Sequence, residues 1–181
     1  MFSGARKAAA LIVLSGIIGA AAPPPAAAAE PLLVDQNARV FTLSSLRGTP
    51  LIVTFVAASC TEACPLINAQ FAQTQAAFKR QRLNARLLTI TLDPRNDTPR
   101  VMRVLAQRFG ADPHRWLLAS GSVRNVQRVL DAFGVRTGDD HTTFVYVFDA
   151  NGVLHDRLLA SSVLQAQLAG ELHAMSARGG R

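Results

Sequence analysis

The sequence predicts a three-layer α/β/α domain with a mostly parallel central sheet and an added antiparallel hairpin. Three observations support this prediction. Short apolar runs alternate with segments of helical periodicity, a turn sequence separates two strand patterns near the C-terminus, and two cysteines follow the first apolar run. Strands that alternate with helices form a parallel sheet, because each crossover returns the chain to the same edge. The length of 181 residues suits one domain.

The first 29 residues have the pattern of a secretory signal peptide. Arg6 and Lys7 precede an apolar stretch over residues 8–22, and three prolines and an alanine run follow, up to Ala29. A basic start, a short apolar centre and small residues before a cleavage point are typical of such a signal. We expect cleavage after Ala29 and a periplasmic domain over 30–181. The alternative is an uncleaved anchor in the inner membrane, although a spanning helix needs about 20 apolar residues.

The charge distribution argues against nucleic-acid binding. The formal net charge is +7, which falls to +5 without Arg6 and Lys7. The basic residues are almost all arginines and are scattered; Arg80, Arg82 and Arg86 come nearest to a cluster. Nucleic-acid-binding proteins combine basic clusters with aromatic platforms, so we expect no such partner. A basic surface can still attract acidic membrane faces or acidic proteins.

The N-terminal half contains two buried strands and two helix starts. The patterns predict an alternating strand over 39–43, a buried strand over 51–56, a helix over 65–82 and a second buried strand over 86–92. Pro65 opens the first helix at a position where its missing N–H has no partner to lose. Thr98 followed by Pro99 predicts the start of a second helix, which ends near Gly110.

The C-terminal half contains a third helix, a hairpin and a last helix. The patterns predict a short strand over 116–118, a helix from Ser122 to Phe133, a hairpin over 143–154 and a helix over 162–177. Ser122 is a favourable N-cap, and Gly134 follows that helix at a position where glycine is common. Asp149-Ala150-Asn151-Gly152 is the turn of the hairpin. No internal repeat or linker interrupts the order, so we expect one domain over about residues 33–178.

Cys60 and Cys64 are the only cysteines, and they lie between the strand over 51–56 and the helix that Pro65 opens. This position brings both thiols to a helix N-terminus, whose partial positive charge favours thiolates. With a dithiol after the first buried strand of such a sheet, the plan is thioredoxin-like. The cysteines are four residues apart, whereas those of ordinary thiol oxidoreductases are three apart.

Two such cysteines can form a disulfide or hold one soft metal ion. In an oxidising compartment a lone pair of cysteines ordinarily pairs, so we expect a reversible disulfide between Cys60 and Cys64. A metal ion would need a third ligand, because two sulfurs leave it under-coordinated. Two thiolates and one imidazole suit Cu(I), whereas structural zinc normally has four protein ligands.

The third ligand could come from one of four histidines: His114, His141, His155 and His173. His114 lies in a polar turn, His155 in the hairpin and His173 in the last helix, and we expect surface or structural positions for these three. His141 lies in the loop directly before the hairpin, and in a thioredoxin-like sheet that loop lies beside the dithiol turn. Position alone leaves open whether His141 reaches the cysteines.

Five separated motifs carry a resemblance to a known family. They are Leu46-Arg47-Gly48, Cys60-x-x-x-Cys64-Pro65, Leu92-Asp93-Pro94-Arg95-Asn96-Asp97-Thr98-Pro99, the segment from Trp116 to Gly121, and Asp140-His141-Thr142 ahead of an apolar strand and the turn Asp149-Ala150-Asn151-Gly152. In this order and spacing, over about residues 35–170, the chain resembles the Sco/SenC copper chaperones, which help assemble the copper centre of cytochrome c oxidase.

The resemblance implies a metallochaperone rather than an enzyme. It implies that Cys60, Cys64 and His141 hold one copper ion, as Cu(I) or Cu(II). It also implies that Asp93 and Asp97 are structural or docking residues and not ligands. The implied partner is the copper-bearing subunit of cytochrome oxidase or another periplasmic copper protein.

Two positions depart from the family pattern. Thr61 stands where the family often has proline, and only residues 134–140 separate the third helix from His141, where the family usually has a longer loop. The short loop bears on partner docking more than on metal ligation, and it can indicate a different client.

Three other functions compete with the metallochaperone. The strongest is a thiol–disulfide oxidoreductase that reduces client cysteines before metallation, with His141 assisting thiolate formation. A thiol peroxidase is disfavoured, because the segment before Cys60 lacks the proline–threonine arrangement that activates a peroxidatic cysteine. An inert structural disulfide would need neither a helix N-terminus nor an adjacent histidine loop.

Overall fold

The computed structural model describes residues 29–136 and 143–179. Within these residues the chain forms seven strands, one short 3₁₀ helix and four α-helices, in the order β1 (Leu33–Asp35), β2 (Val40–Phe41), η1 (Ser44–Leu46), β3 (Leu51–Val56), α1 (Ala63–Gln81), β4 (Arg86–Thr91), α2 (Pro99–Arg108), β5 (Trp116–Gly121), α3 (Val123–Phe133), β6 (Phe144–Phe148), β7 (Leu154–Leu159) and α4 (Leu164–Gly179). Apart from Ala29, the predicted signal segment over 1–29 lies outside the described residues. Of the α-helices in the described part of the chain, none combines the length and the apolar character that a membrane span needs.

The seven strands form one sheet in the order β2-β1-β5-β4-β3-β6-β7. β4 pairs in parallel with β3 and with β5, whereas every other pairing is antiparallel. The predicted parallel core and added hairpin are therefore present. The sheet is parallel only in its three central strands, because β1 and β2 add antiparallel strands at the edge opposite the hairpin. β1 is the first described element, so within the described residues no helical crossover of the kind that links parallel strands leads into it.

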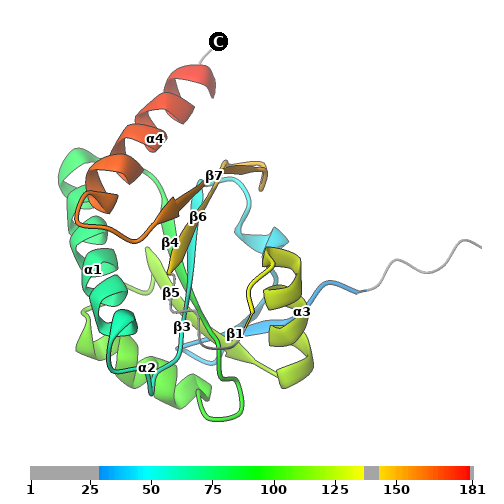
Figure 1. Ribbon diagram of the computed structural model, residues 1–181. Helices are drawn as coiled ribbons and strands as arrows, with labels where there is room; N and C mark the ends of the chain where they lie inside the picture. The colour runs from blue at the N-terminus through cyan, green and yellow to red at the C-terminus, as the bar shows by residue number, and fades with distance from the viewer. Residues whose placement is uncertain (1–28, 137–142, 180–181) are drawn as a thin grey trace, which may run out of the picture.

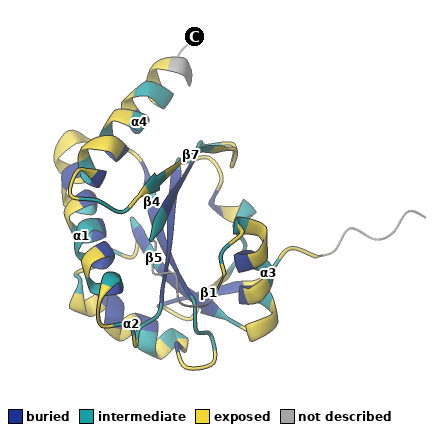
Figure 2. Cartoon of the chain, viewed as in Figure 1, coloured by how far each residue is buried: buried dark blue, intermediate teal, exposed yellow. Residues whose placement is uncertain are grey.

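The sheet lies between two helical layers, as the fold class predicts (Figure 1). α1, α2 and α4 cover one face, where the largest fully buried side chains are Trp116, Phe71 and Phe78. α3 covers the other face, where Val126, Val129 and Leu130 pack on Phe55 and Ile90. All six residues of β3 are buried, and Figure 2 shows the central strands in dark blue between the helices. A strand buried on both faces is mostly apolar, and the one polar side chain of β3, Thr54, is hydrogen-bonded through its hydroxyl.

Side chains and glycine set the helix ends where the sequence predicts them. The Thr98 hydroxyl accepts a hydrogen bond from the Val101 N–H at 3.4 Å, and the Ser122 hydroxyl accepts one from the Asn125 N–H at 3.2 Å. Gly134 follows α3 with a φ of 65°, a left-handed conformation that favours glycine. These caps of α2 and α3 are confirmed.

Several element bounds differ from the prediction. α1 begins at Ala63, so Pro65 lies inside its first turn, where backbone N–H groups still lack intrahelical acceptors. β5 and β7 are longer than predicted, because their polar halves are held by pairing with β1 and β6 rather than by strand propensity. β1 was not predicted, and the strand expected over 39–43 is reduced to β2.

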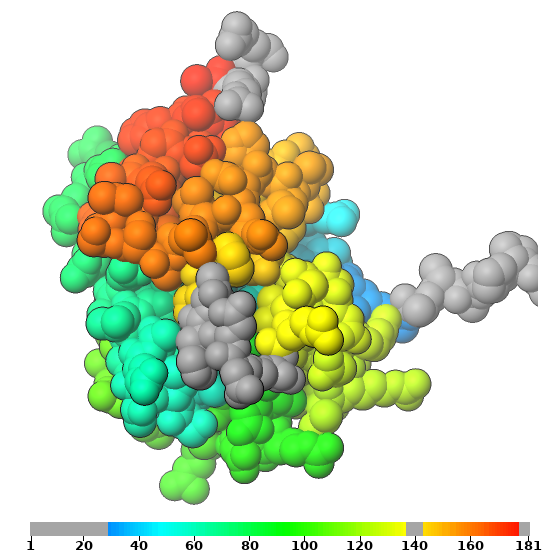
Figure 3. Space-filling view, in the orientation of Figure 1, coloured from blue at the N-terminus to red at the C-terminus, as the bar shows by residue number. Residues whose placement is uncertain are grey.

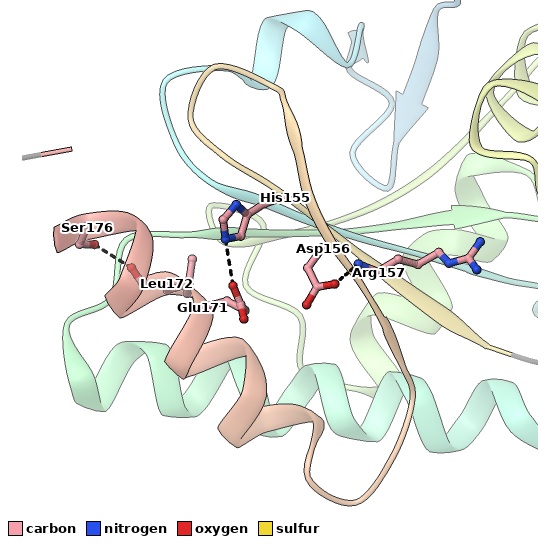
Figure 4. A network of polar contacts seen from close by, with 6 residues as sticks. All are labelled: His155, Asp156, Arg157, Glu171, Leu172 and Ser176. Carbon is pink, nitrogen blue, oxygen red and sulfur yellow. Dashed lines mark hydrogen bonds and ion pairs between the residues drawn. The ribbon is translucent and has the colours of Figure 1, made fainter. Parts of the chain in front are cut away.

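α4 packs beside α1 and is linked to the hairpin, and in the space-filling view its orange-red to red atoms lie against the orange atoms of β7 (Figure 3). Leu164, Leu168 and Leu172 recur at intervals of four residues and are buried against the core. His155 Nε2 of β7 lies 3.0 Å from Glu171 Oε2 of α4, and Figure 4 shows the two side chains pointing toward one another. This contact gives His155 a structural position, as expected from its place in the hairpin.

Candidate metal centre

The turn after β3 carries Cys60 and leads directly into α1. The Cys60 N–H donates a hydrogen bond to the Ala57 carbonyl oxygen at 3.1 Å, which turns the chain back on itself. Glu62 is the N-cap of α1, and Cys64 lies in its first turn. Cys60 therefore lies just before a helix N-terminus and Cys64 lies within it, at the end of a fully buried strand.

The two cysteines face one another as free thiols. The Cys64 N–H donates a hydrogen bond to Cys60 Sγ at 3.3 Å, which brings the two cysteines together. Cys64 is buried in the core that α1 covers, and Cys60 is partly exposed at its edge. An incoming molecule or ion can therefore reach Cys60 Sγ from solvent first and then contact both sulfurs.

The two thiols differ in acidity. Burial raises the pKa of Cys60, but hydrogen bonds from the Cys64 thiol and from the N–H groups of Cys64, Glu62 and Ala63 outweigh it, so the net pKa lies below the ordinary 9.0. Burial raises the pKa of Cys64 to about 12, and its hydrogen bond to Cys60 contributes to the increase. Cys60 is thus the more acidic and the more accessible of the two, which are the properties of an attacking thiol.

A buried carboxylate from the next strand supports the dithiol turn. Asp97 follows β4, and its Oδ2 accepts hydrogen bonds from the Ala58 N–H at 3.0 Å and from the Thr91 hydroxyl at 2.6 Å. The carboxyl ends of the parallel strands β3 and β4 meet at one edge of the sheet, so this loop lies beside the dithiol turn. The family resemblance implies a structural or docking role for Asp97 but not this contact. The signal for the contact is an aspartate that follows a strand parallel to β3.

The strand that follows residues 137–142 begins at the same edge. β6 is antiparallel to β3, so Val145 lies opposite Thr54 near the end of β3. The Thr54 hydroxyl donates to the Phe144 carbonyl oxygen at 3.1 Å. His141, the predicted third ligand, lies outside the described residues. The structure therefore brings Cys60 and Cys64 together and leaves the position of His141 as a prediction.

The remaining histidines do not join the cysteines. His114 and His173 are exposed, and His155 contacts Glu171, so the expectation of surface or structural positions is confirmed for all three. Within residues 29–136 and 143–179, no group of three or more His, Cys, Asp or Glu side chains could hold a metal ion.

A cavity of about 380 Å³ lies at the other end of the sheet, near the start of β3. Its walls are mostly apolar and include Leu51, Phe133 and Phe148. Among the described residues that line it there is no cysteine or histidine, so these residues offer none of the soft ligands that the dithiol turn provides.

Comparisons with known proteins agree with this architecture. The SCO1/SenC family model matches residues 21–177. A SCO2-like protein of Rickettsia felis is 27% identical over 132 residues, which cover 66% of this chain and 63% of the relative. The chain thus spans less than two thirds of the length of that curated relative.

Solved structures have the same fold. The structure of Bradyrhizobium japonicum ScoI with copper bound has a TM-score of 0.67 at 25% identity, covering 80% of this chain and 96% of that one. A SCO1/SenC family lipoprotein from Bacillus anthracis has a TM-score of 0.73 at 19% identity, covering 80% and 92%. These likenesses confirm the thioredoxin-like fold. Because the family model matches most of the chain, including the dithiol turn, the protein belongs to the SCO1/SenC family.

Proposed function

We propose that this protein is a copper metallochaperone that binds one copper ion and supplies it to a cytochrome oxidase copper centre. The observation that carries the proposal is the pair of free thiols at a helix N-terminus, where the Cys64 N–H donates a hydrogen bond to Cys60 Sγ and Cys60 is partly open to solvent. Membership of the SCO1/SenC family and the likeness to copper-bound Bradyrhizobium japonicum ScoI support copper as the cargo. Thiolate ligands favour Cu(I) over harder ions.

In this proposal Cys60, Cys64 and His141 are the ligands. Cys60 makes the first contact, because it is the more exposed and acidic thiol. Cys64 then gives up its proton to a solvent base as the positive ion approaches, since a bound cation stabilises a thiolate. The start of β6 beside the end of β3 supports a third ligand from the loop before Phe144.

We further propose an exported protein. Residues 1–29 would direct the chain to the periplasm, as a cleaved signal or as an inner-membrane anchor, with residues 30–181 as the copper-binding domain. The partner would be the copper-bearing subunit of cytochrome oxidase or another periplasmic copper protein. One structural relative, BsSco, is a member of the Sco family of cytochrome c oxidase assembly proteins, and another relative is a SCO1/SenC family lipoprotein.

Copper binding by the reduced protein tests the ligand set. We expect one copper ion per chain in competition with zinc, and loss of binding in Cys60→Ser and in Cys64→Ser. His141→Ala should weaken Cu(I) binding without abolishing it, because two thiolates remain, and should nearly abolish the stable Cu(II) complex. His114→Ala is the matched control, since His114 is exposed and lies just before β5, at the opposite end of the parallel strands from the dithiol turn. A preference for zinc would refute copper as the cargo. Cu(II) spectra that are the same in His141→Ala and His114→Ala would show that His141 is not a ligand.

The acidity difference between the thiols favours a second candidate, a thiol–disulfide oxidoreductase. The Cys60 thiolate would attack a client disulfide and form a mixed disulfide. Cys64, deprotonated as it attacks, would then displace the client from Cys60 Sγ. Two electrons pass from the protein dithiol to the client, which leaves as a dithiol, and the protein becomes oxidised.

Oxidase activity at limiting copper, in cells that lack the native copy, separates these two functions with the same variants. A copper carrier needs the imidazole as well as both sulfurs, so His141→Ala should disable it. Activity that persists in His141→Ala but is lost in Cys60→Ser and Cys64→Ser would favour the oxidoreductase.

A further inference from the structure

We propose that Asp97 is a positioning residue for the dithiol: its buried carboxylate fixes the turn that carries Cys60 against the end of β4. The residue acts through the backbone of Ala58. This inference rests on the proposed function only in treating Cys60 and Cys64 as a working pair, and it requires nothing of the metal.

One carboxylate oxygen joins the two loops at this edge of the sheet. Asp97 Oδ2 accepts the Ala58 N–H at 3.0 Å and the Thr91 hydroxyl at 2.6 Å. Thr91 ends β4, and its hydroxyl oxygen also accepts the Asp93 N–H at 2.9 Å. The Asp97 N–H donates to the Asp93 carbonyl oxygen at 2.8 Å, which closes the loop that holds the carboxylate. The Asp97 carboxylate is therefore fixed by the Thr91 hydroxyl on one side and by the backbone of its own loop on the other.

The burial of Asp97 makes these contacts consequential. The residue is only 2% exposed, and a carboxylate removed from water requires hydrogen-bond donors. Ala58 precedes Cys60 by two residues, and the Cys60 N–H turns back to the Ala57 carbonyl oxygen. Asp97 therefore fixes the beginning of the turn, while α1 fixes its end at Cys64.

A turn held at both ends keeps the two sulfurs at one separation. The thiols then have a high effective concentration toward each other, which favours closure of the disulfide as well as joint binding of one ion. If the Asp97 contacts are lost, Cys60 samples more positions and disulfide closure becomes less favourable.

Asp93 provides a matched control in the same loop. Its carboxylate is partly exposed, and Oδ2 accepts a hydrogen bond from Asn96 Nδ2 at 2.7 Å, within the loop itself. Both aspartates follow β4, but Asp97 is the one whose side chain holds the backbone after β3.

The experiment compares Asp97→Ala, Asp97→Asn and Thr91→Val with Asp93→Ala in metal-free full-length protein, at a temperature where circular dichroism shows each to be folded. The first readout is hydrogen exchange of the backbone amides of residues 57–60. The second is the equilibrium with glutathione disulfide, which takes two electrons and two protons from the dithiol and becomes two glutathione thiols, leaving the protein disulfide.

In Asp97→Ala we expect the Ala58 amide hydrogen to exchange at least about tenfold faster than in wild type, because its hydrogen-bond acceptor has been removed. The equilibrium constant for oxidation of the protein dithiol by glutathione disulfide should fall at least about tenfold, because the two thiols have a lower effective concentration toward each other. Asp97→Asn keeps an oxygen acceptor and should lie between Asp97→Ala and wild type. Asp93→Ala should match wild type in both readouts.

A purely structural Asp97 would lower the melting temperature and leave exchange at Ala58 and the glutathione equilibrium unchanged, and this result would overturn the proposal. If Asp97→Ala does not fold, Asp97→Asn and Thr91→Val test the proposal, since both retain the side-chain shape. Wild-type amide exchange and a wild-type glutathione equilibrium in both variants would overturn the proposal. The measurement contains no copper, so failure of the wild-type protein to bind copper would refute the proposed function and leave this result intact.

Discussion

Alkylation of the reduced, metal-free protein should label Cys60 well before Cys64. The pKa of Cys64 is raised to about 12 and that of Cys60 lies below 9.0, so the thiolate populations at neutral pH differ by at least about 1,000-fold. The thiolate of the weaker acid is the better nucleophile, which reduces this ratio by about 30-fold for a Brønsted coefficient near 0.5. A rate ratio of at least about 30 should remain, and the burial of Cys64 increases it further.

The assay is the initial rate of iodoacetamide labelling at each cysteine, followed by mass spectrometry from about pH 6 to pH 10. Both rates rise with pH because the thiolate reacts. The Cys60 curve should reach its midpoint below pH 9.0, whereas the Cys64 curve should still be rising at the highest pH.

Two substitutions of Cys64 check the cause of this difference. Cys64→Ala removes the side-chain donor to Cys60 and should move the Cys60 midpoint upward. Cys64→Ser keeps a donor and should move it less. Labelling of Cys64 first, or at the same rate as Cys60, would refute the reasoning.

Two further predictions concern stability, measured by urea unfolding. Trp116→Phe should lower the free energy of unfolding by about 2–3 kcal/mol, because it removes the hydrogen bond from Nε1 to the Thr89 hydroxyl at 2.9 Å and leaves space beside Phe71; a change below about 0.5 kcal/mol would contradict this packing. Ser122→Ala should cost about 1 kcal/mol through loss of the α3 cap. Ser120→Ala is its control and should be near neutral, since the buried Ser120 hydroxyl has no hydrogen-bond partner among the described residues; equal losses in both serine variants would argue against the cap.

The elements that could be predicted from sequence are those whose cause is local. The continuous apolar run of β3 and the caps at Thr98, Ser122 and Gly134 are short-range signals, and the structure contains all four. β1 could not be predicted in this way. It is three residues long and pairs with the neighbouring short strand β2 and with β5, so its stability depends in part on a partner far along the chain.

The candidate site was predictable in its sulfur chemistry and not in its support. The spacing of Cys60 and Cys64 predicts two converging thiols, because both residues lie in the one turn that leads from the buried strand into the helix. The contact between Asp97 and Ala58 arises from the parallel pairing of β3 with β4, a long-range relation that no local pattern encodes. The opposite pKa shifts of the two thiols likewise follow from burial and hydrogen bonding, which appear only in the folded chain.

One of the two edge strands, β7, bears on how this protein avoids aggregation. An exposed strand edge is a template onto which another chain can add. Here the pairing of β6 with β7 carries an irregularity between Val147 and Phe148, and the middle of β7 holds Asp156 and Arg157. The Arg157 guanidinium lies over the ring of Phe144, 4.2 Å from its centroid. An incoming strand would meet charged side chains and an uneven register, so β7 discourages polymerisation along its free edge, on the side away from β6, while Cys60 in the dithiol turn remains partly exposed.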